Sequence, residues 1–207
     1  MSLSAASPPA GSATPGDAVI RRFILQPLAG TWVRDTVLVV AAVALTALCA
    51  QISIPVPGSP VPITGQTFAV MLIGASLGVR RGLISMLAYL VIGAAGAPIF
   101  SDGSSGGHVI LGATGGYIVG FLLAAPLMGW AAARGWDRTP LKAFPVFLVG
   151  QIAIFGVGVP WLAVSAHVSL STAIALGFTP FILGGIVKGA LAGALLPTAW
   201  KLVGRDH

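Results

Sequence analysis

The sequence has 207 residues, of which 56% are hydrophobic and 8% are charged. A soluble domain typically contains about 25% charged residues, and a single domain of this length cannot bury so much apolar surface in its own core. The composition therefore excludes an ordinary soluble domain and indicates one domain that is solvated by lipid. The net charge of +6 does not indicate a nucleic-acid partner, because the basic residues separate apolar segments instead of clustering.

Residues 1–34 precede the first long apolar segment. Their first twenty residues are rich in Ser, Ala, Pro and Gly, which predicts a disordered segment on the cytoplasmic side of the membrane. Arg21 and Arg22 leave open a twin-arginine export signal. That alternative is the minor one, because no small-residue cleavage site follows and many apolar segments come later.

Six apolar segments follow, each bounded by charged residues or by Gly and Pro clusters. Their lengths and hydrophobicity predict transmembrane helices. The expected spans are 36–54, 65–79, 82–97, 109–133, 143–164 and 172–202. We therefore expect residues 35–203 to form one all-α membrane domain, a bundle of six transmembrane helices.

Positive charge is distributed unevenly among the predicted loops. Ten of the eleven basic residues precede the first helix, lie at or beyond the C-terminal end of the sixth, or lie between the second and third or the fourth and fifth helices. The alternate loops, 55–64, 98–108 and 165–171, contain no Lys or Arg. The positive-inside rule then places both termini in the cytoplasm. The eleventh basic residue is Lys188.

The second and third predicted helices are short. A helix of 15 or 16 residues rises about 23 Å, less than the roughly 30 Å of the hydrocarbon core. Both helices end, on the outer side, in irregular segments at 55–64 and 97–109. Non-helical backbone at membrane depth is tolerated only where it is buried inside the protein or lines a cavity. These segments predict a cavity open to the outside; the alternative is ordinary surface loops above tilted helices.

Lys188 lies in the middle of an apolar run, GGIVKGALAGALL (184–196). A lysine at the centre of a membrane helix costs about 3 kcal/mol on insertion scales, and such residues usually face a bundle interior or a wet cavity. Snorkelling of the ammonium to a membrane surface does not explain this lysine, because Lys188 is not near either end of the apolar segment. Its partner is therefore expected to be Asp102, in an outer loop, or the polar or anionic group of a ligand.

The outer segments supply further groups for a ligand. Phe100 and Trp161 can stack on an apolar ring, although Trp161 also suits an anchor at the membrane interface. Tyr117 lies deeper, where its hydroxyl needs a partner. The loop 99–108 can hydrogen-bond a ligand or form a solvated turn. The polar candidates are Thr64, Gln66, Thr67, Ser101 and Asp102.

An intramembrane serine hydrolase is a different class that the sequence leaves as a remote alternative. Residues 103–106 read GSSG, which fits a GxSG pattern, and His108 and His167 are available as bases. Such an enzyme needs its serine at the head of a membrane helix and its base on another helix, whereas these residues lie in loops. We therefore expect no enzymatic activity. The sequence also contains no nucleotide-binding glycine loop and no metal-ligand motif, so no cofactor or metal is expected.

Three stretches together resemble the BioY family, the biotin-specific S components of energy-coupling factor (ECF) transporters. They are AQISIPVPGSPVPITGQTFAV (50–70), GAPIFSDGSSGGHVILGATGGYIVGF (96–121) and PFILGGIVKGALAGALL (180–196). The likeness covers nearly all of residues 36–200 in matching order. It implies a six-helix bundle in the bacterial cytoplasmic membrane, with a cavity near the extracellular side. It also implies high-affinity biotin binding and uptake as a substrate-capture subunit.

The resemblance also implies roles for individual residues. Lys188 matches the lysine of the family's last-helix motif and would contact the ligand, while Ser101 and Asp102 match polar residues before the Gly-rich loop. Tyr117 falls in the family's TGGY segment. Similar proteins often carry an acid three residues before the lysine, where this chain has Gly185. This departure leaves open an S component for a different small vitamin.

In ECF transporters the S component works with a T component and two ATPase subunits, so the resemblance implies these partners, whether dedicated, shared or absent. The first predicted helix carries small residues along one face, at Ala42, Thr46 and Ala50. Spacing alone favours packing of this face inside the protein. The resemblance makes docking to the T component an equal alternative.

Overall fold

The computed structural model of the protein describes residues 31–203. The expected cytoplasmic segment 1–34 lies outside the described residues except for 31–34, which already belong to the first helix, α2 (Thr31–Ala50). The remaining elements are β1 (Ser53–Ile54), β2 (Ile63–Thr64), α3 (Gln66–Ala94), the 3₁₀ turn η1 (Ser101–Gly103), α4 (Gly107–Leu111), α5 (Gly115–Ala133), α6 (Pro140–Ser165), α7 (Leu170–Gly177) and α8 (Phe181–Val203). The described part of the chain is thus mostly helical, as predicted.

The described residues contain five helices long and apolar enough to cross a membrane, namely α2, α3, α5, α6 and α8. Large apolar side chains face outward on these helices. Leu48, Val164 and Leu183 are 69%, 76% and 73% exposed. Exposed apolar surface on this scale indicates a lipid-facing perimeter.

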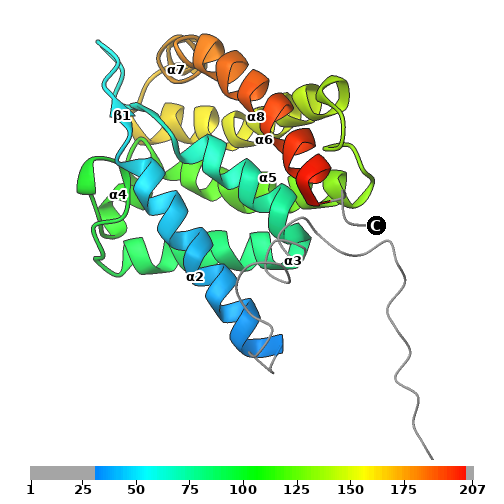
Figure 1. The fold of residues 1–207 in the computed structure, drawn as a ribbon. Helices are drawn as coiled ribbons and strands as arrows, with labels where there is room; N and C mark the ends of the chain where they lie inside the picture. The colour runs from blue at the N-terminus through cyan, green and yellow to red at the C-terminus, as the bar shows by residue number, and fades with distance from the viewer. Residues whose placement is uncertain (1–30, 204–207) are drawn as a thin grey trace, which may run out of the picture.

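Helix α3 reverses its direction at Gly78. This residue has φ 79° and ψ −179°, a backbone conformation that is essentially confined to glycine. The halves before and after it run back along each other (Figure 1). A Cβ on Gly82 would lie 3.3 Å from the Cα of Gly74, although a continuous helix would separate these residues by about 12 Å. The break lies in the part of the sequence where two short helices were predicted to meet.

Two of the predicted helical spans are interrupted, so these predictions were wrong in detail. The span 172–202 is divided into α7 and α8, where Tyr117 donates a hydrogen bond of 2.9 Å to the Gly177 carbonyl and Pro180 has no N–H to continue the helix. The span 109–133 is divided into α4 and α5, where Trp161 Nε1 donates to the Gly112 carbonyl at 3.1 Å. In both places a distant aromatic side chain satisfies a carbonyl that the helix would have used.

Helix α5 occupies the middle of the bundle. It packs against α3 on one side and α6 on the other, while α2 covers α3 and α8 covers α6 (Figure 1). A Cβ on Gly120 would lie 2.9 Å from the Cα of Ile154, so α5 and α6 approach closely because this position has no side chain.

The two ends of the bundle differ in structure. The antiparallel β1–β2 hairpin and α4 lie at one end, and the reversal of α3 lies at the other (Figure 1). Near the reversal Arg81 forms an ion pair of 2.8 Å with Asp35 of α2. The hairpin end is the end that contains the cavity described below.

Candidate functional site

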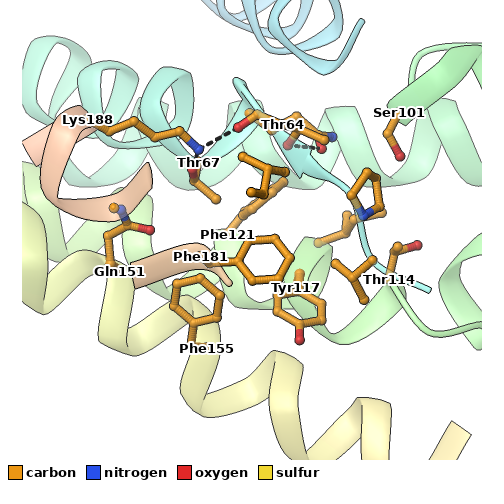
Figure 2. A pocket seen from close by; sticks show the side chains of 16 residues that line it. Thr64, Thr67, Ser101, Thr114, Tyr117, Phe121, Gln151, Phe155, Phe181 and Lys188 are labelled. Carbon is orange, nitrogen blue, oxygen red and sulfur yellow. Dashed lines mark hydrogen bonds between the residues drawn. The ribbon is translucent and has the colours of Figure 1, made fainter. Parts of the chain in front are cut away.

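A cavity of about 40 Å³ lies between the β1–β2 hairpin and the helices α3, α5, α6 and α8. Sixteen residues line it, and they come from segments far apart in the sequence (Figure 2). The polar and charged ones are Thr64, Gln66, Thr67, Ser101, Thr114, Tyr117, Gln151 and Lys188. The apolar ones are Val61, Pro62, Ile63, Ile118, Phe121, Phe155, Phe181 and, without a side chain, Gly185.

Lys188 lies at one side of the cavity and reaches across to the hairpin. Its Nζ donates to the Thr64 carbonyl oxygen at 2.6 Å and to Thr67 Oγ1 at 2.9 Å. An ammonium has three N–H donors, so one donor remains for another partner. Among the described lining residues Lys188 alone carries a formal charge, which makes this side of the cavity cationic.

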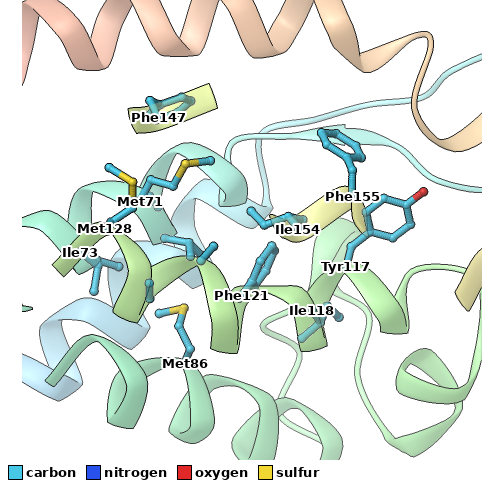
Figure 3. Packing of buried hydrophobic residues seen from close by; sticks show 14 of the residues in the cluster. Met71, Ile73, Met86, Tyr117, Ile118, Phe121, Met128, Phe147, Ile154 and Phe155 are labelled. Carbon is cyan, nitrogen blue, oxygen red and sulfur yellow. The ribbon is translucent and has the colours of Figure 1, made fainter. Parts of the chain in front are cut away.

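Three of the apolar lining residues are phenylalanines, Phe121, Phe155 and Phe181. The ring of Phe155 packs edge-on against Tyr117 at 5.8 Å and contacts Phe181 at 5.7 Å. This aromatic wall continues into the hydrophobic core, where Phe121 and Phe155 lie near Ile154 (Figure 3). Such a wall suits the face of an apolar ring.

A second polar group of residues lies across the cavity from Lys188. Figure 2 shows Ser101 of η1 and Thr114 on the opposite side from Lys188 and Gln151, with the phenylalanines between them. The cavity therefore has a cationic polar side, an aromatic middle and a hydroxyl-bearing side. This order suits a ligand with polar groups at both ends and an apolar middle, and the cavity of about 40 Å³ must widen to admit one.

Tyr117 and Gln66 line the cavity, but their polar atoms already have partners. The Tyr117 hydroxyl donates to the Gly177 carbonyl, so Tyr117 lines the cavity with its ring. Gln66 Nε2 donates to the Tyr89 hydroxyl at 2.6 Å, and its Oε1 accepts from Thr64 Oγ1 at 2.9 Å. These hydrogen bonds stabilise the shape of the lining.

The structure does not bring three of the expected residues to the cavity lining. Phe100 is fully buried and packs edge-on against Tyr89, with ring centroids 5.4 Å apart. Asp102 is exposed, and its carboxylate accepts from Ser53 Oγ at 3.1 Å, so Lys188 takes its partners elsewhere. Trp161 is held by its bond to Gly112 outside the cavity.

The small-residue face of α2 is buried. Ala42, Thr46 and Ala50 are 3%, 0% and 0% exposed, and Thr46 Oγ1 donates to the Ala42 carbonyl at 2.9 Å. Helix α2 packs on α3. The burial favours the internal-packing interpretation, and this face is not accessible to a docking partner in the structure.

Gln151 is a lining residue that the sequence interpretation missed. It is 6% exposed, and its Nε2 has no hydrogen-bond partner among residues 31–203. The signal was available, because a glutamine inside the apolar run 143–164 is unusual in the same way as Lys188. Phe155 and Phe181 gave no comparable signal, because phenylalanine is common in any membrane helix.

The geometry expected of a serine hydrolase is not present among the described residues. Ser104 Oγ donates to the Ser101 carbonyl at 2.7 Å. His108 and His167 are both exposed. The hydroxyl therefore lacks the hydrogen bond to a base that activates a nucleophile.

Comparison with known proteins decides the family. The sequence profile of the BioY family matches residues 20–205. The chain belongs to the BioY family. Relatives include "Biotin transporter BioY2" of Lactococcus lactis, 35% identical over 154 residues that cover 74% of this chain and 83% of the relative. "Probable biotin transporter BioY" of Pyrococcus horikoshii is 41% identical over 159 residues, covering 77% and 91%.

A solved structure described as the S-component for biotin from an ECF-type ABC transporter has a similar fold. Its TM-score is 0.75 at 26% sequence identity, and the match covers 82% of this chain and 92% of that one. As a BioY-family protein with several membrane-spanning helices, the chain is a multi-pass protein of the plasma membrane. Its family is one of transporters and not of hydrolases.

Proposed function

We propose that the chain binds biotin in the cavity beside Lys188 and acts as the substrate-capture subunit of an ECF-type transporter. The observation that carries this proposal is the order of groups across the cavity, from Lys188 through the phenylalanines to Ser101 and Thr114. Biotin has a carboxylate, an apolar thiophane ring region and a hydrogen-bonding ureido head. The names of the relatives and of the similar solved structure support the same ligand.

The proposed topology has six membrane crossings with both termini in the cytoplasm. Helix α3 supplies two crossings because it reverses at Gly78, and α2, α5, α6 and α8 supply the others. Arg80 and Arg81 follow the reversal directly, while residues 55–64 contain no basic residue. The positive-inside rule then places the reversal in the cytoplasm and the hairpin outside. The cavity, which is lined by hairpin residues 61–64, lies on the extracellular side in this topology.

The proposed partners are a T component and two ATPase subunits, either dedicated to this chain or shared with other S components. The ECF context of the similar solved structure supports them. Because the small-residue face of α2 is buried, the docking surface would comprise the outward-facing residues of the helices.

The proposal is tested by equilibrium binding of biotin to the detergent-purified protein, measured by isothermal titration calorimetry. Desthiobiotin and biotin methyl ester are titrated in parallel, and a circular dichroism melt shows that the protein is folded. Saturable binding with a 1:1 stoichiometry supports the proposal. Absence of biotin binding in folded protein refutes it, and the same titration is then made with other vitamins.

A further inference from the structure

The side-chain amide of Gln151 is a buried polar group whose donor is unused. Gln151 lies in α6, is 6% exposed and lines the cavity, and its Nε2 has no hydrogen-bond partner among the described residues. A buried amide without partners is costly, and most buried polar groups in proteins are paired. An unpaired donor beside the cavity is therefore explained if the amide turns Nε2 toward a ligand that supplies the acceptor.

Gly185 of α8 makes room for this amide. A Cβ at position 185 would lie 2.9 Å from Gln151 Nε2, which is closer than real Cβ atoms come to a neighbour. Any other residue at 185 would displace the amide, and the amide is free to move because it ends a flexible side chain. The position of the Gln151 amide thus depends on the glycine that faces it from the next helix.

Lys188 lies one helical turn after Gly185 and faces the same cavity. Two of its three N–H donors are used by Thr64 and Thr67. Figure 2 shows the Lys188 ammonium and the Gln151 amide on the same side of the cavity. Nε2 itself is fully buried beside Gly185, and a half-turn of the amide group, which exchanges the positions of its nitrogen and oxygen, brings Nε2 toward the cavity. No carboxylate occurs among the described lining residues. This side offers donors and positive charge, which is the environment that an acceptor oxygen requires.

We propose that Gln151 recognises the bound ligand directly, by donating from Nε2 to an acceptor oxygen beside Lys188, and that Gly185 keeps the space this amide needs. This inference rests on the proposed biotin site. In biotin the acceptor is a carboxylate oxygen or the ureido carbonyl oxygen. Titrations with biotin and with biotin methyl ester distinguish these two possibilities.

The experiment is a mutant cycle on the full chain, read by calorimetric titration with biotin. The variants are Gln151→Ala, Gly185→Ala and both changes together. Each single change is expected to weaken biotin binding by about 3- to 100-fold, the range of one hydrogen bond to a neutral or charged partner. The double variant is expected to bind no more weakly than Gln151→Ala alone, because Gly185→Ala acts only through the amide.

Two further variants separate recognition from folding. Gly184→Ala is the matched control, since a Cβ there would meet only Ile63 at an ordinary 3.8 Å, and its affinity is expected to equal that of the wild type. Gln151→Leu keeps the side-chain volume and removes the unpaired amide. It is expected to weaken biotin binding while holding or raising the melting temperature without biotin, whereas a purely structural role would lower the melting temperature.

Titration with biotin methyl ester identifies which oxygen of biotin accepts the hydrogen bond from Gln151. The ester keeps a carbonyl acceptor but a weaker one than a carboxylate. If Gln151→Leu therefore weakens biotin more than the ester, Gln151 contacts the carboxylate; if it weakens both equally, Gln151 contacts the ureido carbonyl. Wild-type affinity for biotin in Gln151→Leu, or an equal loss in Gly184→Ala and Gly185→Ala, overturns the inference. Failure of the wild-type protein to bind biotin refutes the proposed function itself, and with it this inference.

Discussion

The Lys188 ammonium in α8 donates a hydrogen bond of 2.6 Å to the backbone carbonyl of Thr64 in β2. This bond joins the last membrane helix to the hairpin that covers the cavity, across 124 residues of sequence. The buried charge is thus held by a carbonyl and a hydroxyl, and no side chain in the described lining neutralises it. An anionic ligand or a strong acceptor would be attracted to this position.

Replacing Lys188 by Ala is expected to weaken biotin binding by one to three orders of magnitude, or roughly 1.4–4 kcal/mol. The change removes the one formal charge of the lining and a hydrogen-bond donor. Calorimetric titration measures the effect, and Lys142→Ala is the control, because that exposed lysine lies at the start of α6. Unchanged affinity in a folded Lys188→Ala protein would remove Lys188 from the site.

Replacing Asp102 by Asn is expected to change biotin affinity by less than about threefold, since a rim charge that does not touch the ligand contributes little. The carboxylate is exposed and bonded to Ser53, outside the cavity lining. Asparagine tolerates the positive φ of 57° found at this position, so the fold is expected to persist. A loss as large as that of Lys188→Ala would make the outer loop the main recognition element.

Replacing Tyr117 by Phe is expected to separate stability from binding. The ring that lines the cavity is kept, while the hydrogen bond to the Gly177 carbonyl is lost. The free energy of unfolding is expected to fall by about 0.5–1.5 kcal/mol, seen as a lower melting temperature by circular dichroism. Biotin affinity is expected to stay within about threefold, because the lost hydrogen bond lies outside the ligand contact. A large loss of biotin affinity with an unchanged melting temperature would instead indicate that the Tyr117 hydroxyl binds the ligand.

Replacing Gly78 by Ala is expected to destabilise the fold by about 1–3 kcal/mol, the cost of a side chain in this backbone conformation. Gly78 makes the reversal of α3, with φ 79°. Gly156→Ala is the control, since nothing lies within 4 Å of a Cβ there. Equal melting temperatures for the two variants would show that the reversal does not require glycine.

The sequence by itself determined the class of the protein. Long apolar segments, the few charged residues and their uneven distribution are local properties, so they predicted a helical membrane protein and a break near Gly78. The cost of burying a charge is local as well, which is why Lys188 could be selected as a site residue. The resemblance to the BioY family was likewise carried by contiguous stretches.

Only the tertiary structure decided which side chains share the cavity. Asp102 faces outward and Gln151 faces inward because of packing between segments far apart in the chain, and no local pattern encodes that. The division between α7 and α8 coincides with a bond from Tyr117, 60 residues earlier. The small-residue face of α2 is buried because α3 packs on it. In each case the deciding contact joins residues that are distant in sequence, so its effect appears only when the helices are assembled.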